Sequence, residues 1–246
     1  MPSYSDLTTG DANPLKRFVQ KRRLADALRA LRALAADYRG AVLDYGGADG
    51  QLSRRIAARL PQARVVCYEP AAYLAAEAER QFAGVPNARL VTSLAELEGE
   101  RFDYCFCLEV LEHLPEPLVQ QTLTRIEQLL VPGGRCVIGV PNEVFFPALV
   151  KGLFRMVRRP GQFDTRLGNV FGAVIGRPPA DRPLGELVPG LPYHFFHLGF
   201  DYRRLRRTLG RRFAIEKTYG SPLPWAPLWL NFEVYFVLRR KAESAI

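Results

Sequence analysis

The sequence predicts an α/β fold in which helices cover both faces of a doubly wound, mostly parallel sheet. Short apolar runs alternate with helical patterns between residues 41 and 142. A turn with three glycines joins the first apolar run to the first of these helices, and several runs are followed by an acidic residue. Such alternation is typical of parallel sheets, whose ligands bind at the carboxyl ends of the strands.

The chain begins with a polar segment, residues 1–13, that we expect to be loosely ordered. From Pro14, apolar residues recur at helical spacing with basic residues between them, which predicts a helix that ends at Gly40. Such a helix either packs on the core and covers an active site or lies on a membrane. We therefore divide the chain into a leader with this helix, residues 1–40, and a main domain, residues 41–246.

The first strand and its turn carry the most specific pattern. Residues 41–45 are apolar except for Asp44, and Gly46, Gly47 and Gly50 follow. Glycine adopts positive φ angles and lets the backbone approach a ligand closely. The dinucleotide-binding spacing Gly-x-Gly-x-x-Gly fails here. A carboxylate beside the turn instead suits a ligand with a cationic end, such as an amino acid.

The second and third strands follow in the expected rhythm. Residues 64–68 form an apolar run, and Glu69-Pro70 comes directly after it. A carboxylate at this place can accept both hydroxyls of a ribose, although Glu-Pro at a strand end also fits a simple turn. An alanine-rich helix over residues 71–82 leads to a third strand over residues 88–92.

The fourth strand, residues 102–108, runs into the sequence Glu-Val-Leu-Glu-His. A helical pattern over residues 118–130 then ends at Val-Pro-Gly-Gly, and residues 135–142 form a fifth apolar run. The order is therefore five strands with a helix or turn between each pair, which favours one parallel sheet.

Residues 41–142 resemble the class I S-adenosylmethionine-dependent methyltransferases of types 11, 12 and 23, and are similar to the ubiquinone-biosynthesis O-methyltransferases. The motif Asp-x-Gly-x-Gly-x-Gly begins at Asp44, with Ala48 where the middle glycine is usual. Phe-Asp, Glu-x-x-Glu-His-Leu and Leu-x-Pro-Gly-Gly follow in family order. The resemblance implies a Rossmann-like, seven-stranded sheet with an antiparallel last strand. It also implies a transferase that uses S-adenosyl-L-methionine and releases S-adenosyl-L-homocysteine.

The resemblance also implies which residues bind the cofactor. The amino-acid end would lie at the first turn, the ribose at the acid after the second strand, and the adenine after the third strand. At that last place the family usually has an acid and this chain has a serine. The end of the fourth strand completes the pocket. The residues so implied are Asp44, Gly46, Gly47, Gly50, Glu69, Pro70, Ser93, Leu94, Leu108 and Glu109.

Two carboxylates and an imidazole follow the fourth strand as Glu109, Glu112 and His113. They can hold a divalent cation or supply a general base near an acceptor hydroxyl. We expect His113 and His197 to be the catalytic residues, as proton acceptors, without a bound metal. The small-RNA 3′-terminal 2′-O-methyltransferases share this pattern. Resemblance to them implies Mg²⁺ held by the same three residues and a later histidine, here His197.

Residues 143–193 break the α/β alternation with a mixture of apolar and basic residues. We expect an insertion after the fifth strand that covers the acceptor site. Its composition suits a lipid-like or anionic acceptor at a membrane surface; alternatively, its apolar residues face the core. A last helix, within residues 197–209, then precedes two alternating runs, residues 213–219 and 232–238, which predict an antiparallel hairpin.

Composition narrows the class of protein. The net charge of +9 over 246 residues favours an anionic partner or, more simply, arginine-rich solvated helix faces. No apolar stretch approaches the roughly 18 residues of a membrane-spanning helix, and the first residues lack the order of a signal peptide. The four cysteines have no metal-type spacing. We expect a cytoplasmic protein with peripheral contact to the inner membrane face as an option.

We therefore predict a biosynthetic methyltransferase that forms an O-methyl group on a small-molecule, lipid-linked or glycan intermediate. One alternative is a metal-dependent RNA 3′-end 2′-O-methyltransferase, which the basic charge favours. The sequence shows no interleaved basic and aromatic run of the kind that binds nucleic acid, so this partner is disfavoured. The other alternative is a methyltransferase-like binding protein without catalysis, for which Ala48 and Ser93 are the argument.

Overall fold

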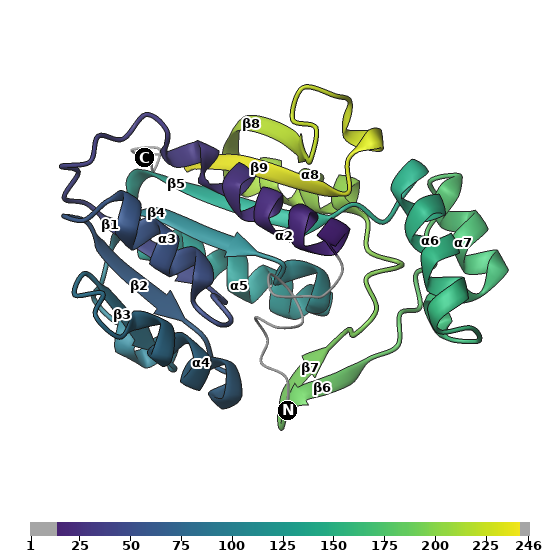
Figure 1. Ribbon diagram of the computed structural model, residues 1–246, viewed down its shortest axis with the longest axis horizontal. Coiled ribbons are helices and arrows are strands. Elements are labelled where there is room, and N and C mark those ends of the chain that lie inside the picture. Colours follow the sequence, from purple (N-terminus) through teal and green to yellow (C-terminus); the bar gives the residue numbers. More distant parts are fainter. Residues whose placement is uncertain (1–13, 242–246) are drawn as a thin grey trace.

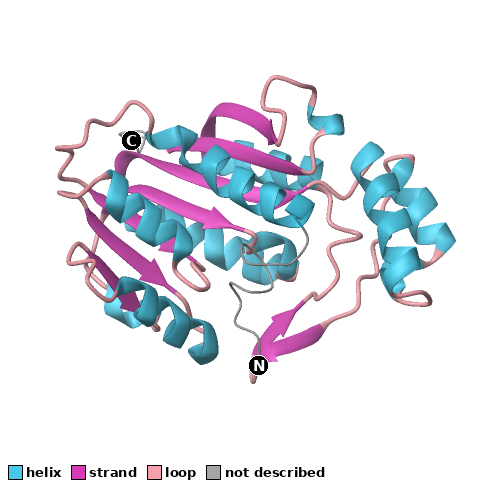
Figure 2. Cartoon of the chain, viewed as in Figure 1, coloured by secondary structure: helices cyan, strands magenta, loops and turns pink. Residues whose placement is uncertain are grey.

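The computed structural model describes residues 14–241, with side chains from residue 21 onward. The predicted leader over residues 1–13 lies outside this range. Seven strands form one sheet in the order β3-β2-β1-β4-β5-β9-β8, and helices cover both of its faces (Figures 1 and 2). The predicted α/β fold with a doubly wound sheet is thus confirmed.

Five parallel strands form most of the sheet, and one strand reverses direction. The parallel strands are β1 (Ala41–Tyr45), β2 (Arg64–Tyr68), β3 (Ala88–Val91), β4 (Phe102–Leu108) and β5 (Leu130–Pro141). The last strand, β9 (Glu233–Arg240), inserts between β5 and β8 (Phe213–Ser221) and is antiparallel to both. The expected antiparallel last strand is confirmed.

Two hydrophobic layers hold the helices against the sheet. One layer joins α3 (Gln51–Arg59), the end of α2 (Pro14–Ala27) and the turn η1 (Leu28–Leu31) to one sheet face, with α4 (Ala72–Phe82) beside α3 (Figure 1). The other layer joins α5 (Glu116–Leu129) and α8 (Tyr202–Arg212) to the opposite face. Successive strand residues point to opposite faces, so Val42 belongs to the first layer and Leu43 to the second. All four cysteines are buried and unpaired.

The N-terminal helix is shorter than predicted. It ends at Ala27 and tightens into η1, rather than continuing to Gly40. Two hydrogen bonds of Asp26 account for the end of the helix. Its buried carboxylate accepts a hydrogen bond from Ser221 Oγ at 2.8 Å, and its backbone carbonyl accepts one from the Tyr219 hydroxyl. Both partners lie on β8, so the last helical turn is fixed against the sheet, and the chain beyond it turns toward β1.

The segment after β5 forms a separate group of elements, as the predicted insertion requires. It contains α6 (Phe146–Arg158), η4 (Phe163–Thr165), α7 (Leu167–Val174) and a hairpin of β6 (Gly185–Val188) with β7 (Leu191–Tyr193). Figure 1 shows α6 and α7 side by side, beyond the end of the sheet. No helix in residues 14–241 is long and apolar enough to cross a bilayer. The remaining short turns are η2 (Leu94–Leu97), η3 (Leu111–His113) and η5 (Leu228–Leu230).

The packing of α5 on the sheet gives a test of this core. Leu123 is fully buried in the layer that joins α5 to the strands, whereas Leu184 is 56% exposed. Because a core leucine leaves a cavity when truncated, we expect Leu123→Ala to lower the free energy of unfolding by about 2–5 kcal/mol. The matched surface variant Leu184→Ala should change it by less than about 0.5 kcal/mol in the same urea titration. Equal effects would show that α5 is not packed as described.

Candidate functional site

The turn between β1 and α3 lies tightly against the ends of β1 and β2. Gly46 and Gly50 both have φ of 76°. A Cβ on Gly47 would come within 2.4 Å of Cys67 Sγ and 2.9 Å of Asp44 Oδ2, so no larger residue fits there. Ala48 has φ of 49°, a left-handed conformation that costs a non-glycine residue about 1–2 kcal/mol. The alanine therefore keeps the backbone shape that the glycine motif predicts, at some cost in strain.

Asp44 lies beneath this turn, at the carboxyl end of β1. Its side chain is 2% exposed, and Ser53 Oγ on α3 donates a hydrogen bond to its Oδ2 at 2.7 Å. Burial, with a further contribution from the charge of Glu69, raises the pKa of Asp44 to about 7, against the lowering effect of Ser53. A buried carboxylate with one hydroxyl partner is under-compensated, so a cationic ligand group above it would be stabilised.

Glu69 joins the ends of β1 and β2. Its Oε2 accepts a hydrogen bond from the Ala48 backbone N–H at 3.0 Å, and its Oε1 accepts one from the Ala71 N–H at 2.9 Å. Burial raises the pKa of this carboxyl above its usual value, although the two backbone donors oppose the rise. A carboxylate has about four acceptor positions, so two remain for ligand hydroxyls. Pro70, predicted with it, is exposed.

Ser93 and Leu94 follow β3, as predicted, but the serine has a structural role that the sequence argument missed. Ser93 Oγ accepts the Ala95 N–H at 3.2 Å, and Glu96 Oε1 accepts the Ser93 N–H at 3.0 Å. This reciprocal pair is a capping box, and Ser-x-x-Glu in the sequence is its signal. The Leu94 carbonyl accepts from Arg125 on α5. Both contacts fix the backbone where the adenine was predicted to lie.

Two glutamates that follow β4, Glu109 and Glu112, meet a third from the last strand, Glu233. Glu109, with φ of 55°, forms an ion pair with Arg23 of α2 at 3.1 Å. Burial opposes its ionisation, but the Arg23 guanidinium, the hydrogen bond with Glu233 and the charge of Lys151 together outweigh burial and lower the pKa of Glu109. Glu233 of β9 hydrogen-bonds Glu109, and burial together with that charge raises the pKa of Glu233. Burial and the charge of Glu109 likewise raise the pKa of Glu112. No motif or spacing in the sequence pointed to Arg23 or Glu233.

His113 and His197 lie together, as the prediction that both serve one reaction requires. Their Nε2 atoms are 3.2 Å apart, and Glu112 Oε1 is 3.6 Å from His113 Nε2. His113 Nδ1 is 2.8 Å from the His194 carbonyl, and its ring stacks on Tyr193. A carbonyl only accepts, so Nδ1 carries the proton and the Nε2 lone pair faces the cluster.

The cluster of Glu112, His113 and His197 offers three ligand atoms within 4.8 Å of one another. Both carboxylate oxygens of Glu112 are buried and have no hydrogen-bond partner among the described residues. Burial lowers the pKa of His113, and lowers that of His197 to about 3. Both rings are therefore neutral at pH 7, and His197 is a weak base. An unsatisfied carboxylate beside two neutral imidazoles has the chemistry of a cation site.

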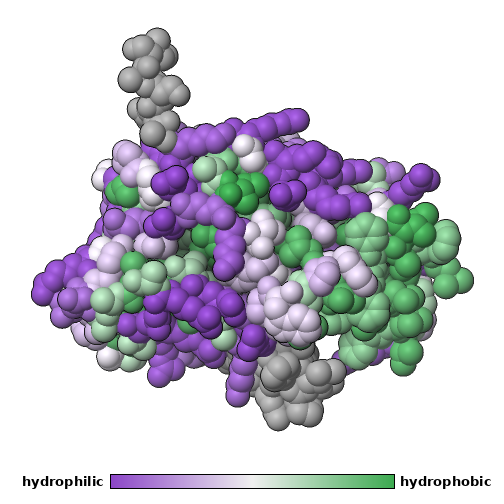
Figure 3. Space-filling view, turned by 90° about the horizontal axis from the view of Figure 1, so that it is seen from above, coloured by the Kyte–Doolittle hydropathy of each residue, from purple (hydrophilic) through white to green (hydrophobic). Residues whose placement is uncertain are grey.

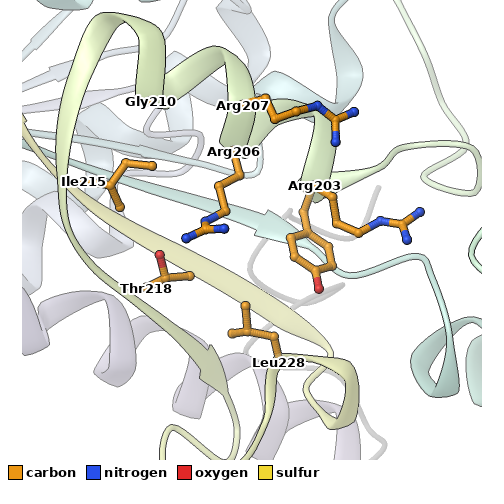
Figure 4. A pocket seen from close by; sticks show the side chains of 8 residues that line it. Arg203, Arg206, Arg207, Gly210, Ile215, Thr218 and Leu228 are labelled. Carbon is orange, nitrogen blue, oxygen red and sulfur yellow. The ribbon is translucent and has the colours of Figure 1, made fainter.

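The arginines of α8 do not belong to this site. Arg203 is bound by Asp201 and by the Gly176 carbonyl. Arg206 and Arg207 line an open groove of about 590 Å³ between α8 and the edge strand β8, where Figure 4 shows Arg206 reaching toward Thr218. The residues that line this groove come from α8, β8 and η5 and include no member of the acidic and histidine cluster.

Asp44 gives a pH test of the site. Folding raises its pKa from about 4 to about 7, so stability falls as pH rises through this window, because the unfolded chain has released the proton. We expect ligand-free Asp44→Asn to exceed the wild type in unfolding free energy at pH 8, by up to roughly 4 kcal/mol. The difference should vanish below about pH 4. Urea titrations measure it.

The exposed Asp37 provides the control for this test. Asp37→Asn makes the same side-chain change at a surface site, so it should not reproduce the gain in unfolding free energy that Asp44→Asn shows at pH 8. If the Asp44→Asn and wild-type stability curves ran parallel from pH 4 to 8, the buried, under-compensated state of Asp44 would be contradicted.

Comparison with known proteins bears on what this site is. Residues 43–136 match the methyltransferase domain family. The chain is 31% identical over 156 residues to trans-aconitate 2-methyltransferase of Deinococcus radiodurans, an alignment that covers 61% of this chain and 57% of that protein. The chain thus matches less than two thirds of that relative's length.

Solved structures resemble nearly the whole chain. Magnesium protoporphyrin IX methyltransferase from Synechocystis PCC 6803, with bound S-adenosylhomocysteine, has a TM-score of 0.58 at 18% identity, covering 94% of this chain and 89% of that one. The 1,6-didemethyltoxoflavin-N1-methyltransferase of Burkholderia thailandensis has a TM-score of 0.58 at 18% identity, covering 96% and 86%. These likenesses show the fold. Within that fold, residues 43–136 carry the match to the methyltransferase domain family.

Proposed function

We propose that the protein transfers a methyl group from S-adenosylmethionine to an oxygen of a small-molecule, lipid-linked or glycan acceptor. One observation carries this proposal: two buried carboxylates, Asp44 and Glu69, stand at adjacent strand ends on either side of the tight glycine turn. The magnesium protoporphyrin IX methyltransferase was solved with S-adenosylhomocysteine and with S-adenosylmethionine bound, which supports the same cofactor here.

The cofactor fits the residues in three places. Asp44 and the turn at Gly46 and Gly47 would hold the amino-acid end, where the under-compensated carboxylate meets an ammonium group. Glu69 would accept the ribose hydroxyls through the acceptor positions that its two backbone donors leave free. The capped backbone at Ser93 would meet the adenine. Gly50, Leu94, Leu108 and Glu109 would complete the pocket.

The acceptor would enter beside the acid–histidine cluster, under the segment 143–193. This segment reaches the cluster directly, because its Tyr193 stacks on His113, and the next residue, His194, binds the ring nitrogen. The cofactor supplies an electrophilic methyl on a sulfonium. The acceptor oxygen forms a bond to that carbon as the carbon–sulfur bond breaks, and its proton passes to a base. His113 is the better base, because burial makes His197 a weaker one.

A second candidate is a metal-assisted methyl transfer, as in the RNA 3′-end enzymes considered above. The cluster of Glu112, His113 and His197 favours it, since an unsatisfied carboxylate faces two imidazoles. Two imidazoles suit transition-metal dications such as Co²⁺ or Zn²⁺ more than Mg²⁺, which prefers oxygen ligands. A bound cation would polarise the acceptor oxygen and lower the pKa of its hydroxyl. The third candidate is binding without catalysis.

Transfer of labelled methyl from S-adenosylmethionine into fractionated host extract tests the function. We expect label in a small-molecule, lipid or glycan fraction, with and without chelator. Label in short RNA that disappears with chelator would support the metal-assisted alternative. If no fraction were labelled although the protein bound S-adenosylhomocysteine tightly, the result would support the third candidate, a binding protein without catalytic activity.

Glu69 provides a direct test of the cofactor pocket. Gln keeps the shape but removes the charge and one acceptor group, so we expect Glu69→Gln to weaken S-adenosylhomocysteine binding by about 10- to 100-fold, the equivalent of one or two charge-assisted hydrogen bonds. Calorimetric titration measures the affinity. The matched variant Glu79→Gln, exposed on α4, should bind as the wild type does. Unchanged affinity in Glu69→Gln would exclude the ribose contact.

Co²⁺ tests the metal-assisted alternative without an activity assay. Co²⁺ bound by nitrogen and oxygen ligands absorbs visible light, so its titration reports the site directly. If the site holds metal, His197→Gln and Glu112→Gln each remove a metal ligand and should weaken Co²⁺ binding by at least about 10- to 100-fold. That is the loss typical when a residue that only supports a metal ligand is replaced. His194→Asn is the control, because the His194 ring lies against the Pro183 carbonyl and outside the cluster. A wild-type protein that binds no Co²⁺ would dispose of this alternative.

A further inference from the structure

Helix α6 has its polarity reversed relative to an ordinary surface helix. Its inner side carries Lys151 and Arg155, whose charged groups reach into the protein. Its outer side carries Leu149, Leu153 and Val157, which are 41%, 56% and 86% exposed. A helix on a water-facing surface normally does the opposite, with its apolar stripe toward the core.

Helix α7 continues the same surface. Leu167, Phe171 and Ile175 are 77%, 66% and 50% exposed and recur at four-residue spacing, so they form one stripe along the helix. The two helices approach closely, because a Cβ on Gly152 would come within 2.6 Å of Val170. Figure 3 shows the resulting apolar surface as a continuous green area over the α6–α7 end of the molecule. We call this surface the α6–α7 face.

Buried ion pairs fix the outward direction of these stripes. Glu143 is fully buried and accepts hydrogen bonds from Arg155 at 2.8 and 2.9 Å and from Lys151 at 2.9 Å. Asp164, also fully buried, pairs with Arg155 and Arg159. Turning α6 so that its leucines faced inward would leave these carboxylates buried and unpaired, which costs several kcal/mol each. The exposed apolar stripes are therefore part of the stable fold.

The exposed charges on residues 144–180, which form the α6–α7 face, are of one sign. Within residues 144–180 the only acid is Asp164, which is buried and paired, while the exposed charged residues are all arginines. They are Arg158, Arg159, Arg166 and Arg177. Apolar side chains rimmed by arginine match a bilayer surface with anionic headgroups, where the apolar groups enter the acyl boundary and the guanidinium groups stay with phosphates.

We propose that the α6–α7 face docks on the surface of an anionic lipid bilayer. Docking does not depend on methyl transfer, since no residue of the face belongs to the cofactor pocket or the acid–histidine cluster. It would hold the segment 143–193, and with it the approach to the acceptor site, at the lipid surface.

Co-sedimentation with lipid vesicles tests the proposal. We expect the full chain to bind vesicles of phosphatidylglycerol and phosphatidylcholine, to bind pure phosphatidylcholine vesicles much less, and to lose binding as salt rises. Leu153→Glu with Val157→Glu should weaken binding about tenfold or more, since the double variant loses apolar burial in the bilayer and adds negative charges that anionic headgroups repel. Tyr73→Glu, at a 57% exposed site on α4, is the matched control.

Three outcomes would overturn the proposal: no binding to anionic vesicles at low salt, equal binding by the double variant, or equal loss in the Tyr73 control. A fourth contradicting outcome could come from light scattering of the protein without lipid, which measures its oligomeric state. If the wild type dimerised and the double variant did not, a second copy of the chain would cover the face. Thermal unfolding of the double variant should match the wild type, because both sites are exposed, so a folding defect is distinguishable from lost docking.

Discussion

The cofactor half of the molecule depends on one carboxylate, Glu69, which ties the glycine turn to the second strand. By accepting the N–H groups of Ala48 and Ala71, it holds the turn in a strained left-handed shape that an alanine would otherwise avoid. The glycine turn packs so closely on Asp44 that Gly47 has no room for a side chain. Two buried carboxyl groups thus stand beside a bare backbone. Burying these carboxyl groups costs desolvation free energy. A ligand with an ammonium group and ribose hydroxyls would offset this cost.

The acid–histidine cluster shows how distant segments complete a site that the central motif only begins. Glu109 and Glu112 come from the end of β4 and the turn after it, but Arg23 comes from the N-terminal helix, Glu233 from the last strand and His197 from the loop before α8. The strands end at one edge of the sheet, so their polar termini converge there. Arg23 forms an ion pair with Glu109, and each of the three glutamates keeps at least one carboxyl oxygen without a hydrogen-bond partner in the described part of the chain. A proton shared between carboxylates or a bound cation resolves this excess of acid.

The sequence predicted the strands, their order and the strand-end residues because apolar runs and glycine turns are local signals. It also predicted that His113 and His197 meet, through a family resemblance. It could not predict contacts between residues far apart in the chain, such as Arg23 with Glu109. Nor could it decide which side of α6 faces water, because periodicity defines a stripe and not its direction. The ion pairs of buried Glu143 and Asp164 decide that, and they form only in the folded chain. The overlong N-terminal helix has the same origin: helical spacing continues past the residue where β8 fixes the chain.

A crystal structure of the protein grown with S-adenosylhomocysteine is the most direct test of the central claim, that the glycine turn and its two carboxylates form the cofactor pocket. The account predicts the ligand across the carboxyl ends of β1 and β2. Its ribose hydroxyls should lie within hydrogen-bond distance of Glu69, its amino group above Asp44, and its adenine beside Ser93. A ligand bound elsewhere, or no ligand at millimolar concentration, would contradict the account.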